Sequence, residues 1–227
     1  MREIKGCIGR DIAESKAAVL SRFEESKVAA TALVTALEVL EGHPVLTLDK
    51  PSRLPLLTPI NALEPEAIAA EIEEWLGQGF RTFKIKVGKD VDADLVRVAA
   101  IQRATGGRAT LRLDANRAFS RDDGVRFAGG LDPAGIELFE QPCDAADWQA
   151  NGAVAAVSPV PVMMDESIYG FADIDRAAAM KGCGCVKLKI SKMTGVDLLA
   201  EGLRRIRGKG LKPVLGNGAA TDIGCWV

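Results

Sequence analysis

Three acidic residues each close a short apolar run, and their spacing is the first chemical feature of the sequence. Asp114, Glu140 and Asp165 lie 26 and 25 residues apart. One strand–helix unit of a parallel sheet needs about that length, so we expect the three carboxylates at equivalent points of successive units, at the carboxyl edge of a sheet. Acids crowded there would repel one another unless a cation lay between them. Oxygen ligands favour a hard ion, Mg²⁺ before Mn²⁺ or Ca²⁺.

Two pairs of lysines accompany these acids. Lys84 and Lys86 fall in one predicted strand, and Lys187 and Lys189 fall in another. Residues two apart in a strand share a face, so each pair points to one side of the sheet. A lysine beside a second lysine and a divalent ion has a lowered pKa and can act as a base near neutral pH. Together with the ion, such a base predicts removal of a proton from the carbon next to a carboxylate.

The elements that must position these residues alternate regularly along the chain. Two helices, at 11–23 and 26–40, come first, and Ser26 is the expected N-cap of the second. The predicted strands are 54–60, 82–87, 110–114, 135–140, 160–165, 185–190 and 212–215. Regular alternation with polar strand ends favours an α/β fold of the (β/α) TIM-type barrel class over a doubly wound sheet. Seven strands make this barrel incomplete. In a barrel, strands two and six lie across from each other, which would place Lys86 and Lys189 on opposite sides of a substrate.

Composition excludes several classes of protein. The chain has 227 residues and a net charge of −2, which argues against a nucleic-acid partner. The apolar stretch 28–40 is interrupted by polar residues and is too short to cross a membrane. The five cysteines form no disulfide framework, and no signal peptide is recognisable, so we expect reduced thiols and a cytoplasmic protein.

Five short motifs carry a family resemblance. They are FKIKVG at 83–88, RLDAN at 112–116, EQP at 140–142, DES at 165–167 and KLKISK at 187–192. In this order and spacing the sequence resembles the mandelate racemase/muconate lactonizing enzyme family of the enolase superfamily, with the muconate-lactonizing subgroup the most similar. Sites of this superfamily use a Lys or His base with Mg²⁺ and pass through an ene-diolate. The resemblance runs from about residue 26 to the C-terminus.

The resemblance implies a role for each candidate residue. Asp114, Glu140 and Asp165 would bind Mg²⁺, with Mn²⁺ as a substitute. Lys86 and Lys189 would be the acid/base pair. Lys84 would lower the pKa of Lys86 and contact the substrate carboxylate. Asn116 and Glu166 would support the metal ligands without binding the ion, and Lys187 would contact the substrate.

The resemblance also implies a domain organisation and a reaction. Residues 1–50 would be a helical remnant of an N-terminal capping domain, and residues 51–227 a barrel domain without its last strand, as if shortened at both ends. The implied enzyme is a homo-oligomeric isomerase or lyase acting on a small carboxylate through an enediolate. Cycloisomerisation of a muconate-like diacid, epimerisation of a dipeptide or N-acyl amino acid, and o-succinylbenzoate synthesis all fit. The alternative is a non-catalytic remnant, or a metal-binding scaffold that another chain completes.

Three further side chains have more ordinary interpretations. Arg112 shares a strand face with Asp114, and we expect the two to pair. Lysines can protect an edge strand, but the strand holding Lys84 should be internal, which disfavours that explanation. Lys192 is expected to be a solvated loop lysine.

Overall fold

The structure is a computed structural model, and it describes residues 5–46, 50–51 and 53–216. Over these residues seven strands form one sheet in the order β1-β2-β3-β4-β5-β6-β7. The pairs from β1 to β6 are all parallel. A strand order that follows the chain is the order of a (β/α) barrel, whereas a doubly wound sheet reverses its order part-way. The predicted barrel-type α/β fold is therefore confirmed, with seven strands in the described part of the chain.

Each strand overlaps a predicted strand, and two of them also begin and end at the predicted residues. Their bounds are β1 (Thr58–Pro59), β2 (Thr82–Lys86), β3 (Thr110–Asp114), β4 (Ile136–Glu140), β5 (Val162–Met164), β6 (Cys183–Leu188) and β7 (Lys212–Leu215). β3 and β7 begin and end where predicted. β1 is much shorter than the predicted 54–60, and Pro55 within that range has no N–H to donate to a ladder.

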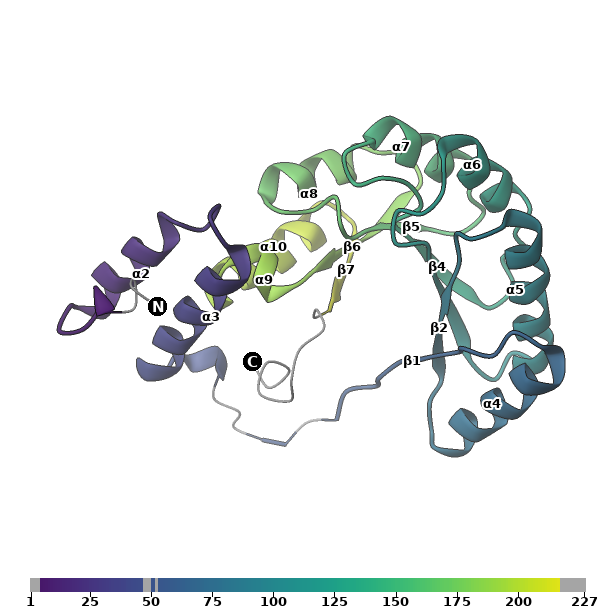
Figure 1. Cartoon of the computed structure of the whole chain (residues 1–227), viewed down its shortest axis with the longest axis horizontal. Helices are drawn as coiled ribbons and strands as arrows, with labels where there is room; N and C mark the ends of the chain where they lie inside the picture. Colours follow the sequence, from purple (N-terminus) through teal and green to yellow (C-terminus); the bar gives the residue numbers. More distant parts are fainter. Residues whose placement is uncertain (1–4, 47–49, 52, 217–227) are drawn as a thin grey trace. The chain divides into compact units, whose positions relative to one another are not determined.

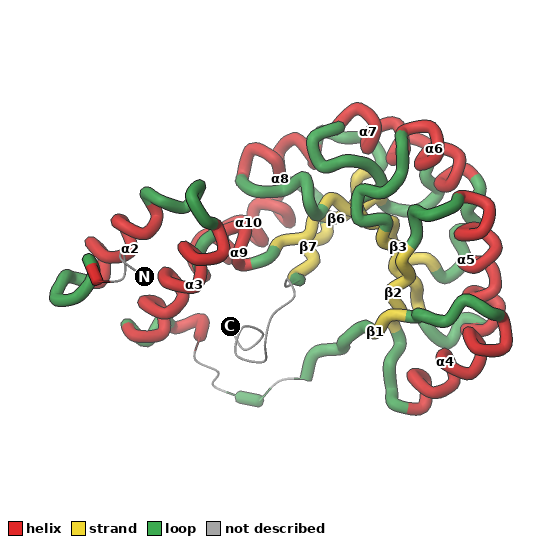
Figure 2. The backbone as a smooth tube through the Cα atoms, viewed as in Figure 1, coloured by secondary structure: helices red, strands yellow, loops and turns green. Residues whose placement is uncertain are grey.

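Helices α4 (Pro65–Gly77), α5 (Val91–Thr105), α6 (Arg121–Gly129) and α7 (Trp148–Val157) connect the first five strands. Figure 1 and Figure 2 both show α4 to α7 along one face of the sheet formed by β2 to β5. Pro65 occupies the first turn of α4. Asp90, Ser120 and Asp147 cap α5, α6 and α7, each accepting a hydrogen bond from the backbone N–H three residues on. The helix starts are thus set by local sequence.

Alternation along the strands separates a core face from a polar face. Phe83, Ile85, Leu111 and Leu113 are buried in one hydrophobic cluster with residues of α4 and α5. The even-numbered residues of β2 and β3 that alternate with these four point to the opposite face, because side chains alternate along a strand. Lys84, Lys86, Arg112 and Asp114 therefore share the face of the sheet that is turned away from the helices.

The sixth strand ends earlier than predicted. β6 stops at Leu188, and Ile190 begins the short helix α9 (Ile190–Met193), with Lys189 as its N-cap residue. The Lys192 N–H donates to the carbonyl of Lys189, which closes this turn. The prediction that the strand runs to residue 190 is wrong, because a helical turn takes over after Leu188. Lys187 lies in the strand and Lys189 does not.

The residues cluster into two compact units. Among the described residues, one contains 53–167 and 175–186, and the other contains 5–46, 50–51, 168–174 and 187–216. In the second unit α2 (Ile12–Leu20) packs on α3 (Lys27–Leu40), and α3 packs on α9. Ser26 caps α3 as predicted, accepting from the Ala29 N–H at 3.3 Å. The predicted division at residue 50 stays a prediction.

The remaining elements complete this description. They are the 3₁₀ helix η1 (Pro44–Leu46), α8 (Phe171–Ala178) and α10 (Val196–Gly208). Residues 217–227, which the sequence analysis assigns to the end of the barrel domain, lie outside the described residues. Among the helices that the structure describes, none combines the length and the apolar character needed to cross a membrane.

Candidate active site

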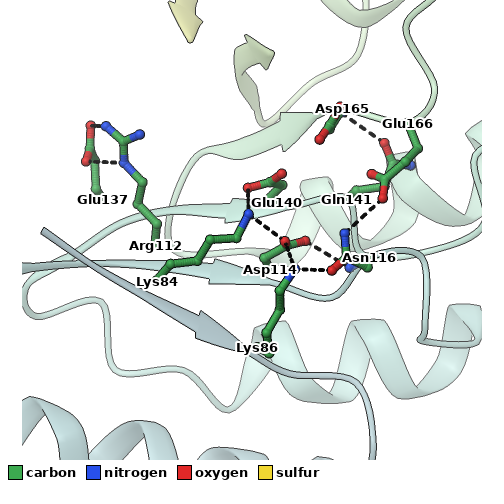
Figure 3. Close-up of polar contacts among 10 residues, drawn as sticks. All are labelled: Lys84, Lys86, Arg112, Asp114, Asn116, Glu137, Glu140, Gln141, Asp165 and Glu166. Carbon is green, nitrogen blue, oxygen red and sulfur yellow. Dashed lines mark hydrogen bonds and ion pairs between the residues drawn. The ribbon is translucent and has the colours of Figure 1, made fainter. Parts of the chain in front are cut away.

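Parallel pairing brings three of the candidate residues into register. Lys86 of β2 pairs with Asp114 of β3, and Asp114 pairs with Glu140 of β4. Each of these residues is the last of its strand, so the three lie at the carboxyl edge of the sheet. Figure 3 shows their side chains converging with that of Lys84. The predicted meeting of lysines and carboxylates at this edge is found within residues 84–140.

Lys84 bridges the two buried carboxylates. Its Nζ lies 2.7 Å from Oδ2 of Asp114 and 3.3 Å from Oε2 of Glu140. Nζ of Lys86 lies 2.5 Å from the same Asp114 oxygen. Asp114 and Glu140 are 0% and 1% exposed. Carboxylates this deeply buried need compensating charge, and the lysines provide it.

The ion pairs shift both partners towards their charged forms. Burial alone would raise the pKa of Asp114, but the charge and hydrogen bond of Lys84 and the hydrogen bond of Lys86 lower it overall. Burial alone would lower the pKa of Lys84, but the Glu140 and Asp114 carboxylates raise it overall. Lys84 is therefore held as a cation in this arrangement.

Asp165 is not at the point equivalent to the other two acids, and the prediction that all three are in register is wrong. Glu140 pairs with Met163, so Asp165 comes two residues later, after β5 has ended. Figure 3 shows Asp165 set apart from Asp114 and Glu140. Its side chain is nevertheless buried, at 1% exposed. Across the described ranges, no three His, Cys, Asp or Glu side chains are grouped so that they could hold a metal ion.

The donor set still fits a hard divalent cation. Asp114 and Glu140 are buried carboxylates at the ends of β3 and β4, Asp165 is a buried carboxylate just after β5, and the ammonium of Lys84 contacts the first two. Buried oxygen ligands of this kind suit Mg²⁺.

Asn116 and Glu166 extend the network from Lys86. Asn116 Oδ1 accepts a hydrogen bond from Lys86 Nζ, and Asn116 Nδ2 donates to Glu166 Oε1 at 2.9 Å. The Asn116 N–H also donates to Asp114 Oδ1 at 2.9 Å. Oε2 of Glu166 is buried and accepts no hydrogen bond within the part of the chain that the structure describes. Asn116 thus contacts Lys86 and Asp114, and Glu166 contacts Asn116, while their support of metal ligands stays a prediction.

Arg112 does not pair with Asp114, and that expectation is wrong. Its Nε and Nη2 lie 2.8 Å and 3.2 Å from the two carboxylate oxygens of Glu137, as Figure 3 shows. The register shifts between Leu111 and Arg112, which leaves Glu137 as the extra residue opposite them. Asp114 is paired with the two lysines, and Arg112 is paired with Glu137 instead.

The other lysine pair belongs to the second compact unit. Lys187 lies in β6 and Lys189 at the start of α9, so their predicted meeting with Lys86 across a substrate stays a prediction. Lys192 is 4% exposed, with Nζ 5.5 Å from the centre of the Tyr169 ring. The expectation of a solvated loop lysine is therefore wrong.

Gln141 is a residue that the sequence analysis left without a role. It is fully buried, and its side chain bonds to the loop after β5. Its position between Glu140 and Pro142, at the end of a buried strand, indicates a structural role. A polar side chain buried there must find its hydrogen-bond partners within the protein. Its contacts were not readable from the sequence.

The chain is similar in sequence to a known family and to characterised enzymes. The family described as "Enolase C-terminal domain-like" matches residues 67–224. An L-Ala-D/L-Glu epimerase of Bacillus subtilis is 33% identical over 141 residues, which cover 61% of this chain and 38% of that enzyme. The matched regions cover between 35% and 49% of the length of the curated relatives.

Solved structures agree in fold. A muconate cycloisomerase from Pseudomonas fluorescens superposes with a TM-score of 0.83 at 29% identity, covering 96% of this chain and 63% of that one. A dipeptide epimerase from Cytophaga hutchinsonii, complexed with Mg and the dipeptide D-Ala-L-Val, gives a TM-score of 0.83 over 95% of this chain and 60% of that one. At 23% identity the latter comparison supports the fold alone.

Proposed function

Because the chain belongs to the enolase C-terminal domain-like family, we propose that it carries the acid/base and metal-holding groups of an enzyme that removes a proton α to a carboxylate. The observation that supports this most directly is at Lys86. Its Nζ contacts both Asp114 and Asn116 at the strand edge where Glu140 also lies. A candidate base, the group that orients it and two buried carboxylates thus meet at one edge.

Each candidate site residue has its own role in the proposed reaction. Lys86, as the free amine, takes the α-proton. Asn116 orients Lys86 by accepting its N–H, and Glu166 orients Asn116. Lys84 donates to the substrate carboxylate. Lys189 exchanges a proton on the opposite face of the substrate, and Lys187 contacts the substrate.

The cofactor in this proposal is Mg²⁺, or Mn²⁺ in its place. Asp114, Glu140 and Asp165 would hold it. When bound, the ion supplies positive charge that polarises the substrate carboxylate. With the ion bound, the Asp114 and Glu140 carboxylates would not depend on Lys84, and the Lys84 ammonium would be available to the substrate carboxylate.

The proposed substrate is a small carboxylate. Epimerisation of a dipeptide or N-acyl amino acid comes first, because a curated relative is an L-Ala-D/L-Glu epimerase and two lysines on opposite faces suit inversion. Cycloisomerisation of a muconate-like diacid comes second, on the likeness to a muconate cycloisomerase. A homo-oligomer in the cytoplasm, with neither nucleic acid nor membrane as partner, completes the proposal.

A non-catalytic role is the alternative. The observation in its favour is that Lys84 lies between Asp114 and Glu140, while Asp165 comes two residues past the register partner of Glu140. In that case the chain would be a remnant, or a metal-binding scaffold that another polypeptide completes.

Deuterium exchange tests the two possibilities. Dipeptides and muconate-like diacids would be incubated with the protein and Mg²⁺ in D₂O, and deuterium at the α-carbon followed by NMR. We expect Mg²⁺-dependent exchange that falls by about 10²–10⁴-fold in Lys86→Met. Lys89→Met is the matched control, because Lys89 is exposed in the loop after the same strand. Exchange unchanged in Lys86→Met would refute the proposed base. Mg²⁺ binding without exchange of any carboxylate would favour the scaffold.

A further inference from the structure

Gln141 holds an unusual backbone conformation directly after Glu140. Its φ is 36°, in the left-handed region that residues with a Cβ rarely adopt. It is 0% exposed, and Pro142 follows it. A buried residue held in a disfavoured conformation needs surrounding contacts that fix it there.

The Gln141 side chain uses its whole hydrogen-bonding capacity. Oε1 accepts from the Asp165 N–H at 3.0 Å and from the Ser167 N–H at 3.1 Å. Nε2 donates to Ser167 Oγ at 2.8 Å and to the Cys143 carbonyl at 3.1 Å. An amide has two acceptor and two donor positions, so all four are occupied. The side chain thus ties the loop after β4 to the loop after β5.

The Gln141 side chain continues the hydrogen bonding between the two segments after their last backbone hydrogen bond. The Gln141 N–H donates to the Met163 carbonyl at 2.8 Å, which is the last backbone bond from this strand to β5. Pro142 has no N–H, so the backbone cannot continue the pairing. Beyond that point the Gln141 amide receives the N–H groups of Asp165 and Ser167. Figure 3 shows Gln141 between Glu140 and the segment that carries Asp165 and Glu166.

We infer that Gln141 is a positioning residue that fixes the backbone of Asp165 relative to Glu140, and so sets the third carboxylate of the proposed cation site. The inference rests on the proposed function for the role of those carboxylates. It explains why an amide stands here. Glutamate would lack the two donors that reach Ser167 Oγ and the Cys143 carbonyl, and would add a charge beside the buried acids.

Asn151 provides a matched control. It is also a fully buried amide, whose Oδ1 accepts from the Cys143 N–H at 3.0 Å. Its Nδ2 donates to the carbonyls of Asp144 and Asp147, at 2.8 Å each. It therefore organises the loop after β4 as Gln141 does, but it makes none of the bonds to Asp165 or Ser167.

The experiment compares Gln141→Met and Asn151→Leu, two replacements by apolar residues of similar size. Mg²⁺ affinity would be measured by calorimetry, and amide hydrogen exchange at residues 165 and 167 without metal. We expect Gln141→Met to bind Mg²⁺ about 10–100-fold more weakly, as other changes around metal ligands do, and to exchange both amides faster. Asn151→Leu should keep the affinity within about twofold and leave these two amides protected.

Two results would overturn the inference. One is unchanged affinity and unchanged exchange in Gln141→Met, and the other is an equal loss of both in Asn151→Leu. Should the wild type bind no Mg²⁺, the proposed function fails, and the metal-free exchange still decides the role of Gln141. If Gln141→Met does not fold, Ser167→Ala removes the Oγ that accepts from Gln141, and faster exchange at residue 165 is expected there. Unchanged protection in that variant would contradict the inference.

Discussion

Nζ of Lys84 lies 2.7 Å from Oδ2 of Asp114, a carboxylate with no exposed surface. The same ammonium reaches Glu140 at 3.3 Å. One ammonium thus bridges two buried carboxylates on adjacent strands, beside a second ammonium, that of Lys86, on Asp114. Lys84 side-chain exposure is only 18%, so this charge is poorly screened by water.

Removal of the Lys84 charge should therefore lower the free energy of unfolding, and added Mg²⁺ should restore part of the loss. In Lys84→Met, the buried Glu140 loses the Lys84 ammonium and Asp114 keeps only that of Lys86, and we expect a loss of about 3–5 kcal/mol in the free energy of unfolding. Added Mg²⁺ should restore more stability to this variant than to the wild type, because an ion that binds the folded state stabilises it. Urea unfolding with and without Mg²⁺ measures both effects. Lys89→Met is the control, and equal Mg²⁺ responses in the two variants would contradict this account.

Arg97 holds the carboxyl ends of β1 and β2. Its guanidinium donates to the carbonyls of Ile60 at 2.7 Å, Ala62 at 3.0 Å and Lys86 at 3.1 Å. Lysine cannot reach three carbonyls in this geometry, so we expect Arg97→Lys to lower the free energy of unfolding by about 1–3 kcal/mol. Arg103→Lys, exposed on the same helix, should change it little. Chemical denaturation compares them, and equal effects would show that the three bonds contribute nothing.

Glu38 caps α10 from a different helix. Both of its carboxylate oxygens accept from the Val196 N–H, at 3.0 Å and 3.2 Å, and the N-cap residue Gly195 has no side chain to do so. Burial raises the pKa of Glu38 above its ordinary 4.5, against the lowering effects of the Val196 bond, Lys16 and His43, while Asp197 adds to the rise. The ionised form is thus disfavoured in the folded state.

The raised pKa of Glu38 determines how its contribution to stability changes with pH. Between pH 4.5 and its folded pKa, Glu38 binds more protons in the folded than in the unfolded state, so its contribution to stability falls as pH rises. Glu38→Gln keeps an acceptor for Val196 and removes this titration. We expect the variant to gain on the wild type as pH rises from 4.5 to 8, measured by urea unfolding. Glu38→Leu should lose about 1 kcal/mol through the lost cap. A constant difference between wild type and Glu38→Gln would contradict the prediction.

Two cysteines should be chemically inert in the folded protein. Burial raises the pKa of Cys143 to about 11 and that of Cys183 to about 12. At pH 8 their thiolate fractions are on the order of a thousandth or less, and the thiolate is the reactive form. We expect iodoacetamide to label the partly exposed Cys7 well before either, with all three labelled after denaturation. Mass spectrometry of the labelled peptides checks this, and early labelling of Cys143 would show that the loop around it opens.

Local sequence determined much of the fold. Ser26, Pro65 and Ser120 begin helices where their chemistry predicts, and β3 is a stretch in which Leu111 and Leu113 alternate with polar residues. Lys84 lies in an internal strand, as expected from the count of strands. These features depend on residues close to one another in the chain.

The differences come from pairing between strands. The bulge opposite Arg112 gives it Glu137 as partner, and no local pattern reveals a bulge that depends on the neighbouring strand. The two-residue offset of Asp165 is likewise a property of the β4–β5 register. Gln141 has a positive φ that its residue type does not suggest, and tertiary contacts hold it there.

Calorimetric titration with Mg²⁺ tests most directly whether Asp114, Glu140 and Asp165 form a cation site. We expect saturable binding of about one ion per chain, weakened at least about tenfold in Glu140→Gln. Binding should persist in Glu137→Gln, which changes the same strand at a residue paired with Arg112 instead. No saturable binding by the wild type, or equal binding by Glu140→Gln, would contradict this expectation.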